Sequence, residues 1–122
     1  MAEEETPVGD EETEGQLAID VYQDNENIYL LAPIAGTAPT DIDVSITDEV
    51  VTIRGERKSG HKAKEEDHFV QECYWGPFSR TFVLPIEVDS GKAKAMLKNG
   101  LLSITIPKSS ASKSKSLKIE LG

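Results

Sequence analysis

The 122-residue sequence predicts a single all-β domain, either a β-sandwich or a barrel, on three observations. Apolar and polar side chains alternate over short runs rich in β-branched residues, which is the pattern of strands with one buried face. Turn-forming residues separate these runs, and Asn99-Gly100 is the strongest hairpin signal among them. No stretch of ten or more residues has a convincing helical period. The length suits one domain with its own core and is too short for two.

The first two predicted strands lie at the start of this domain. Leu17, Ile19 and Val21 share one face of the first strand. The second strand, residues 27–34, is apolar on both faces, so we expect it to be covered on both sides. Residues 24–27, Asp-Asn-Glu-Asn, supply the turn between the two strands.

The next two predicted strands are residues 41–47 and 50–56, which alternate in the same way. Gly36 and Pro39 mark the crossing into the first of them, and Asp48-Glu49 is the turn that joins the pair.

The last two predicted strands flank Asn99-Gly100, where both residues tolerate the positive φ of a tight hairpin turn. One strand is the end of residues 90–98, which is the nearest approach to a helical pattern in the chain, and the other is residues 101–107. Six such strands joined by tight turns favour a sandwich or barrel.

A long charged stretch interrupts the strands. Residues 57–67 contain no apolar side chain except Ala63, and a loop of that length inside a compact domain is usually functional or extends away from it. The stretch leads into residues 68–85, where most of the aromatic residues gather. A polar arm that carries an apolar strand is what strand exchange between subunits requires. The aromatic residues concerned are Phe69, Tyr74, Trp75, Phe78 and Phe82.

The net charge of −9 argues against nucleic acid as a partner, because phosphate binding needs a clustered basic surface. Residues 1–15 hold seven acids and no base, whereas residues 108–122 hold four lysines and one acid. We therefore expect two solvated arms of opposite sign, residues 1–16 and 108–122, around a folded middle, residues 17–107.

The sequence favours a cytoplasmic protein without a membrane partner. The acidic start does not resemble a signal peptide, and the longest run without charged residues is too short to cross a bilayer. The single cysteine, Cys73, cannot close a disulfide within the chain, which fits a reducing compartment. Without a basic neighbour in sequence, Cys73 is expected to be a packed or idle thiol, although a redox role or a link between two exchanged strands is an alternative.

The motifs in residues 76–102 resemble those of a known family. The order G-x-F-x-R-x-F-x-L-P, then V-D, then A-x-x-x-N-G-L-L resembles the α-crystallin domain of small heat shock proteins of the bacterial and plant branch. The likeness covers about residues 17–107 and then the tail. The residues that carry it are Gly76, Phe78, Arg80, Phe82, Leu84, Pro85, Val88, Asp89, Ala95, Asn99, Gly100, Leu101 and Leu102.

The resemblance implies an immunoglobulin-like β-sandwich without an active site or cofactor, whose function is ATP-independent holding of unfolding proteins. It implies homodimers in which a strand around residues 69–74, on a loop within residues 57–76, is exchanged between partners. It also implies that the C-terminal motif Ile119-x-Leu121 docks in a groove at the edge of a neighbour's sandwich and builds larger oligomers. The dimer-interface residues implied are Phe69, Val70, Glu72, Tyr74, Trp75 and Arg80.

Two features depart from the family pattern. Leu121 replaces the usual Ile or Val of the motif, and residues 1–16 are short, acidic and free of aromatics, where family members usually carry a long aromatic-rich arm. Leu117 continues the alternation of the tail and is either a third contact or an alternative register.

Several individual residues have two interpretations. Arg80 shares a strand face with apolar side chains, so it is either paired at the dimer interface or lies at an edge with its stem on the core. Trp75 is either a contact with a client or at an interface, or a half-buried core residue. His61 and His68 invite a metal site, but a solvated loop is the expected interpretation because zinc sites normally need three or four protein ligands.

Three function classes remain open on the residues alone. The first is a chaperone, and the second is a non-enzymatic adaptor of the related sandwich fold that binds one folded partner, as in Hsp90 co-chaperones. A sugar-binding sandwich is the third. No nucleophile, metalloprotease or phosphate-binding motif is present, so an enzyme is not expected.

Overall fold

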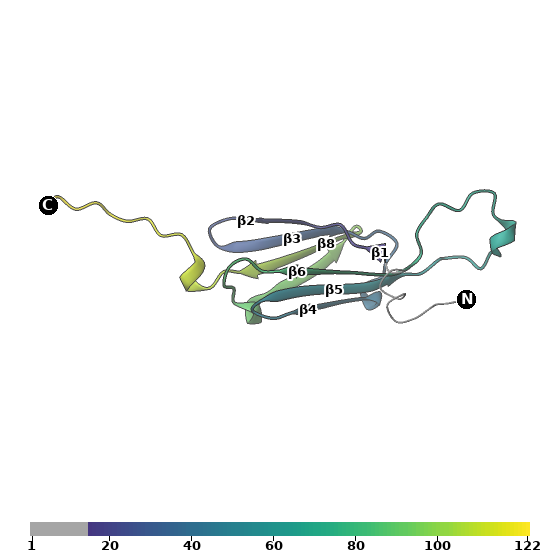
Figure 1. Ribbon diagram of the computed structural model, residues 1–122, viewed down its shortest axis with the longest axis horizontal. Helices are drawn as coiled ribbons and strands as arrows, with labels where there is room; N and C mark the ends of the chain where they lie inside the picture. Colours follow the sequence, from purple (N-terminus) through teal and green to yellow (C-terminus); the bar gives the residue numbers. More distant parts are fainter. Residues whose placement is uncertain (1–14) are drawn as a thin grey trace, which may run out of the picture.

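The computed structural model describes residues 15–122, which form a sandwich of two four-stranded sheets (Figure 1). The strand order is β1-β6-β5-β4 in one sheet and β2-β3-β8-β7 in the other. The described residues contain four short 3₁₀ turns and no α-helix, so the all-β sandwich prediction is confirmed. The strands are β1 (Gly15–Gln16), β2 (Asp20–Gln23), β3 (Asn27–Pro33), β4 (Ile42–Ile46), β5 (Val50–Arg57), β6 (Gly76–Val83), β7 (Lys94–Lys98) and β8 (Leu101–Pro107). The turns are η1 (Pro39–Asp41), η2 (Glu65–Asp67), η3 (Ser90–Lys92) and η4 (Ser110–Ser112).

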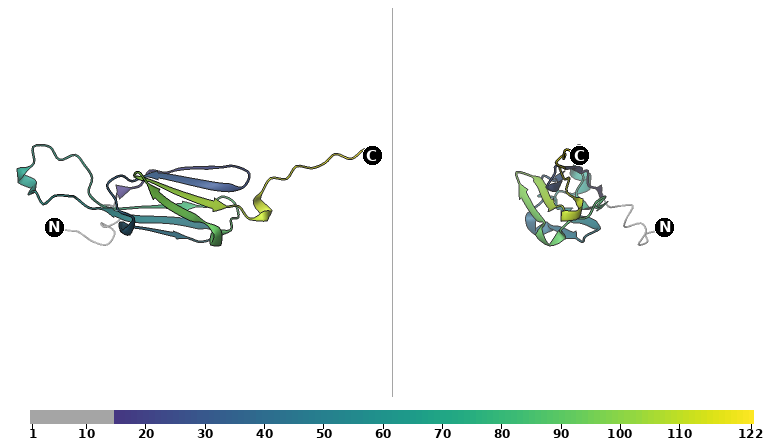
Figure 2. Two further views of the ribbon diagram at one scale, coloured as in Figure 1. Left: turned by 180° about the vertical axis from the view of Figure 1, so that it is seen from behind. Right: turned by 90° about the vertical axis from the view of Figure 1, so that its left-hand side faces the viewer.

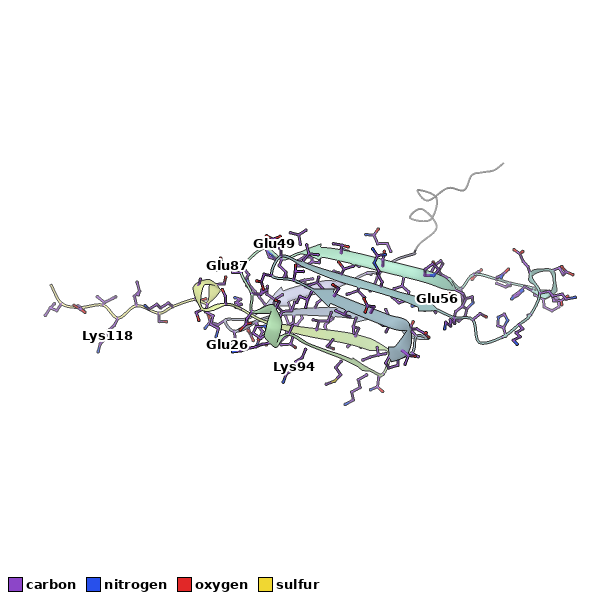
Figure 3. All side chains as sticks on the ribbon, turned by 90° about the horizontal axis from the view of Figure 1, so that it is seen from below. Glu26, Glu49, Glu56, Glu87, Lys94 and Lys118 are labelled. Atoms are coloured by element: carbon purple, nitrogen blue, oxygen red, sulfur yellow. The ribbon has the colours of Figure 1, made fainter. Side chains whose placement is uncertain are left out.

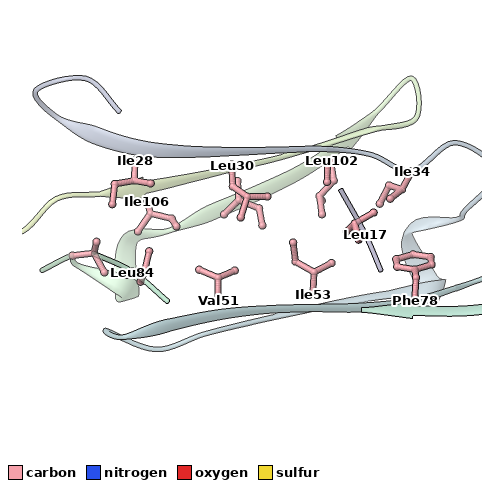
Figure 4. Close-up of a cluster of buried hydrophobic side chains, with 13 residues drawn as sticks. Leu17, Ile28, Leu30, Ile34, Val51, Ile53, Phe78, Leu84, Leu102 and Ile106 are labelled. Carbon is pink, nitrogen blue, oxygen red and sulfur yellow. The ribbon is translucent and has the colours of Figure 1, made fainter. Parts of the chain in front are cut away.

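The core lies between the sheets and is built by alternation along the strands (Figure 4). In β3, every second side chain is buried, and those between are half-buried or, at Pro33, exposed. The expectation that this strand is covered on both faces was therefore wrong, because its outer face has no second layer over it. The buried apolar residues are Leu17, Ile28, Leu30, Ala32, Ile34, Val51, Ile53, Phe78, Leu84, Val88, Leu102, Ile104 and Ile106.

Two turns form as their residues predict. Asn99 and Gly100 have φ values of 54° and 77° and join β7 to β8. In the β2–β3 turn, the Asp24 carboxylate accepts hydrogen bonds from the backbone N–H groups of Glu26 and Asn27, each at 2.8 Å. An acidic side chain that caps its own turn is a common reason for Asp at this place.

The first strand differs from the prediction. Residues 15 and 16 pair in parallel with β6 as the edge of one sheet, and the chain then crosses to the other sheet as β2. Leu17 fills the crossing and is buried. Residues 15–16 thus belong to the sandwich rather than to the predicted arm, and the rest of that arm, residues 1–14, lies outside the described residues.

Two segments leave the sandwich at its opposite ends (Figures 1 and 2). Residues 58–75 extend from the end where β5 finishes and β6 begins, and the C-terminal tail extends from the end that carries the β2–β3 turn. Within residues 15–122, no helix has the length and apolar character needed to cross a membrane.

Candidate functional site

An apolar groove lies between β4 and β7, which are edge strands of the two different sheets. Its volume is about 170 Å³. Neither edge is paired on its outer side within the described chain, so both the groove and the strand edges beside it are open to an extended peptide. The lining residues are Pro39, Ile42, Val44, Ala95, Met96, Leu97 and Leu102.

Local sequence places these side chains at the groove. Alternation in β4 turns Ile42 and Val44 toward the other sheet while Asp43 is exposed. In β7, Leu97 lies opposite Leu102 of β8 and is half-buried against the core. Pro39 begins the η1 turn just before β4 and also lines the groove.

The predicted docking motif of the tail does not occupy this groove in its own chain. Ile119 and Leu121 are 94% and 103% exposed, and Leu117 is 79% exposed. No strand or helical turn follows Ser112, and the tail extends away from the sandwich. Three apolar side chains at alternate positions in an extended segment remain free to contact another surface.

The first residues of the tail are attached to the domain, which differs from the expectation of a solvated arm starting at residue 108. Lys108 is only 7% exposed, and its backbone N–H donates to the Glu26 carbonyl at 2.9 Å. Lys113 forms an ion pair with the Glu26 carboxylate at 3.0 Å, and the Ser114 N–H donates to Asn25 Oδ1 at 2.9 Å. Figure 3 shows Glu26 and Glu87 beside this part of the tail, with Lys118 farther out.

The segment predicted to be exchanged lies outside every strand. Residues 58–75 contain the η2 turn and form no ladder with the rest of the described chain. Phe69 is 104% exposed and Val70 is 66% exposed, and Glu72 and Cys73 are exposed as well. Fully exposed apolar side chains on a protruding segment are typical of residues that pack on a partner. With a single chain described, the exchange stays a prediction.

Tyr74 and Trp75 stand apart from the exposed residues before them, since both are about two-fifths exposed. The Tyr74 hydroxyl accepts a hydrogen bond from the Gly15 N–H at 3.1 Å and donates one to the Pro77 carbonyl. Tyr74 therefore ties the root of the protruding segment to β1 of its own chain.

Arg80 lies opposite the buried Ile53 in the β5–β6 ladder and is half-buried. Its Nη1 donates to the Leu17 carbonyl at 2.8 Å, at the crossing between β1 and β2. This contact lies within one chain, and a role of Arg80 at a dimer interface stays a prediction.

Most of the other residues of the family-like motifs have a structural role. Phe78, Leu84 and Leu102 are core residues, and Phe82 is partly buried against the core. Gly76 has a φ of +137°, a value that side chains with a Cβ rarely adopt. Ala95 lines the groove, and Pro85 is exposed after β6.

The two histidines lie together at the tip of the protruding segment. The ring centroids of His61 and His68 are 5.4 Å apart, and His68 Nδ1 lies 2.9 Å from the Lys64 carbonyl. Across residues 15–122, no group of three or more His, Cys, Asp and Glu side chains gathers as a metal site would need. The solvated-loop interpretation of this pair stays a prediction.

Three pKa shifts arise from two short contacts. The Tyr29 hydroxyl donates to Asp24 Oδ2 at 2.7 Å, which lowers the pKa of Asp24 and raises that of Tyr29. The Asp41 carboxylate, 3.1 Å from Lys58 Nζ, raises the pKa of that lysine. Asp24 lies in the β2–β3 turn, which also contacts the first residues of the tail.

Sequence reasoning expected a groove but did not identify the residues that line it. Pro39, Ile42, Val44, Met96 and Leu97 come from segments about fifty residues apart in the chain. The signal available was alternation in β4 and the apolar run in β7, but the meeting of the two edges depends on how the sheets stack.

Comparison with known proteins finds a matching family model and similar sequences. Residues 20–121 match the model of the Hsp20/alpha crystallin family. The chain is 34% identical over 100 residues to small heat shock protein C4 of Rickettsia felis, covering 82% of this chain and 61% of that protein. It is 36% identical over 90 residues to a probable 15 kDa heat shock protein of Leptospira interrogans, covering 74% and 68%. The chain thus spans roughly three-fifths to two-thirds of these relatives.

Solved structures of similar proteins share the sandwich. Heat shock protein 16.0 of Schizosaccharomyces pombe superposes with a TM-score of 0.74 at 28% identity, covering 88% of this chain and 98% of that one. A small heat shock protein of Xylella fastidiosa, described as having a distinct high order structure, superposes with a TM-score of 0.70 at 30% identity, covering 86% and 96%.

Proposed function

The chain belongs to the Hsp20/alpha crystallin family of small heat shock proteins, and on that premise we propose that it is an ATP-independent holdase. It binds partly unfolded proteins in the cytoplasm and prevents their aggregation, without catalysing a reaction. The observation that carries the proposal is the apolar groove between the unpaired edges of β4 and β7. Aggregation is driven by exposed apolar segments and free strand edges, and a protein that offers a matching groove and edge competes for them.

The proposed dimer forms by exchange of residues 69–74. The segment carries Phe69 and Val70 fully or largely exposed, so burying them on a partner is favourable by about 1.5–3 kcal/mol each. We assign the edge of β2 as the acceptor, because it is hydrogen-bonded only to β3 in the described chain and is four residues long. The edges of β4 and β7 border the groove instead.

The proposed larger assembly forms when Ile119 and Leu121 enter the β4–β7 groove of a neighbouring subunit. Both side chains are fully solvated in the free tail, and the groove offers aliphatic surface to both. Their spacing of two residues puts them on one face of an extended segment. Transfer of two such side chains from water supplies several kcal/mol per tail, before the cost of ordering the tail.

The holdase proposal is tested by heating an aggregation-prone client protein with and without the chain and recording light scattering. We expect stoichiometric amounts to suppress scattering, with or without added ATP. Unchanged client aggregation would contradict the proposal. Ala95→Glu places a charge in the apolar groove and should weaken suppression, while Lys94→Glu introduces the same side chain on the same strand outside the groove lining and should not.

The assembly proposal is tested by mass measurement in solution with Ile119→Ala/Leu121→Ala. We expect assembly to require roughly a hundredfold higher concentration, from the loss of about 3 kcal/mol per docked tail. Ser116→Ala is the control, as an exposed tail residue outside the alternating apolar positions. A wild-type chain that is monomeric at micromolar concentration would instead favour an adaptor that binds one folded partner.

A further inference from the structure

The root of the tail, residues 108–114, contacts the β2–β3 turn at three points. The turn contributes the Glu26 carbonyl to the Lys108 N–H and the Glu26 carboxylate to Lys113. It also contributes the Asn25 side-chain oxygen to the Ser114 N–H. Between these points the chain makes the single turn η4. The tail is therefore held at both ends of its first seven residues.

Further contacts hold the same root from the opposite side. Val88 forms an isolated β-bridge with Lys108, and the Asp89 N–H donates to the Pro107 carbonyl at 2.8 Å. The Ser109 N–H donates to the Glu87 carbonyl at 3.2 Å. Residues 87–89 and the β2–β3 turn together enclose the start of the tail.

This attachment shortens the free part of the tail. From Ser114 to Ile119 the chain has five residues, which span at most about 17 Å when extended and about 12 Å on average as a flexible coil. If the tail were free from Lys108, its eleven residues would span up to about 36 Å and about 18 Å on average.

The near end of the chain's own groove lies beyond that shortened reach. Ala95 lies at the same position along the sheet as Leu30, across the β7–β8–β3 ladder. Leu30 is three residues along β3 from Asn27. The turn lies past Asn27, and two to three strand spacings separate it from β7. At about 3.3 Å per residue and 4.8 Å per strand, the straight-line separation is about 19 Å. A tail on the surface has to go around the rim, which lengthens the path further.

We propose that the β2–β3 turn, through Asn25 and Glu26, is a binding site for the root of the tail that disfavours docking of Ile119 and Leu121 in their own groove relative to docking in a second copy of the chain. The inference rests on the proposed docking of the tail. It assigns to the turn the choice between docking within a chain and between chains, and makes Asn25 and Glu26 positioning residues for assembly.

Charge favours this contact at low salt. The turn and the facing segment carry Asp24, Glu26, Glu87 and Asp89, whereas the root carries Lys108 and Lys113. Lys92 also faces Asp89, at 3.7 Å. Because the Lys113–Glu26 pair is partly exposed, salt that shortens the screening length from about 8 Å to about 3 Å should loosen it.

The first experiment measures amide hydrogen exchange at Ser114 in the full chain. Glu26→Lys should speed exchange by about two- to fivefold, the effect of losing one surface ion pair, and Glu26→Lys/Lys113→Glu should restore slow exchange. Glu49→Lys, a like charge change in the β4–β5 turn, is the control and should have no effect. Equal exchange in wild type and Glu26→Lys would overturn the binding site.

The second experiment separates docking within a chain from docking between chains. A Cys73→Ser/Gly122→Cys/Ala95→Glu chain, labelled with a fluorophore at position 122, has an intact tail and a blocked groove. It is mixed with a chain that ends at Ser114, which has a groove and no docking motif. Fluorescence anisotropy should rise, and it should not rise when the shortened chain also carries Ala95→Glu. The inference would be overturned if the anisotropy did not rise in this mixture although a labelled chain with an unblocked groove shows docking.

Dilution then tests the role of the turn. With an unblocked groove, the chain with the wild-type turn should lose more of its docking on dilution than the Glu26→Lys/Asn25→Ala chain, which should retain a larger fraction that does not depend on concentration. Equal loss of docking on dilution in the two chains would also overturn the inference. If the proposed docking of the tail in the groove is itself wrong, the result is different. No docking is then seen at any concentration, and the anisotropy of the Ala95→Glu chain equals that of the chain with an unblocked groove.

Discussion

Among the glycines of residues 15–122, Gly55 has the least room for a side chain. It lies opposite Phe78 in the β5–β6 ladder, and the Phe78 ring is folded over it and 4% exposed. A Cβ at Gly55 would lie 2.5 Å from Phe78 Cζ, 2.8 Å from Phe78 Cε1 and 2.9 Å from the Asp41 carbonyl oxygen. Real Cβ atoms do not approach other heavy atoms this closely, so Gly55→Ala must displace both the ring and the backbone of η1.

The expected cost of Gly55→Ala follows from that displacement. Overpacking of a core by one methyl group destabilises proteins by about 1–3 kcal/mol. For a domain of this size, we expect the thermal midpoint to fall by roughly 5–20 °C, measured by circular dichroism at a fixed protein concentration.

The control is Gly60→Ala, because a Cβ there meets no atom within 4 Å. We expect Gly60→Ala to leave the midpoint unchanged or slightly raised. Phe78→Leu removes the ring, so Gly55→Ala should cost less in a Phe78→Leu background than alone. A Gly55→Ala chain that melts with the wild type, or an equal cost in both backgrounds, would refute the packing explanation.

Three further outcomes follow from single contacts. Gly100→Ala places a side chain at a φ of +77° and should cost about 1 kcal/mol in thermal unfolding. Arg80→Met leaves the Leu17 carbonyl without its donor and should cost about 1–3 kcal/mol by urea unfolding, whereas equal stability would exclude a role for this bond. The hydrogen bond from Tyr29 lowers the pKa of Asp24 below 3.8, so its stabilisation is present above that value and is lost as the pH falls through the lowered pKa. Asp24→Asn should remove this part of the acid dependence of unfolding, and an unchanged acid profile would contradict it.

Local pattern predicted the strands well because each strand of this fold buries one face. The alternation in residues 41–47 and 50–56 became β4 and β5, and Asn99-Gly100 became a hairpin with positive φ at both residues. The sequence predicted one continuous first strand, but the chain changes sheets at Leu17 and forms β1 and β2 instead. The alternation of apolar residues continues through this change of sheet, so the pattern gave no sign of the break.

The sites were predictable only in part. The apolar character of Ile119 and Leu121 is visible in the tail sequence, and both side chains are exposed. The attachment of Ser114 to Asn25 was not predictable, because it joins residues 89 positions apart through one hydrogen bond and leaves no periodic signal. The same is true of the groove, whose two walls meet only after both sheets have formed.

The chain carries both the motif of the tail and the groove proposed to receive it, so any assembly contains the two in equal numbers. An open assembly leaves a free motif at one boundary and an empty groove at another, and each further subunit moves these unmatched partners without removing them. Only a closed particle matches every motif with a groove. Such a particle has a defined size at which growth stops. Removing a few subunits from it exposes grooves and apolar motifs together, so apolar binding surface becomes accessible only when the closed particle loses subunits.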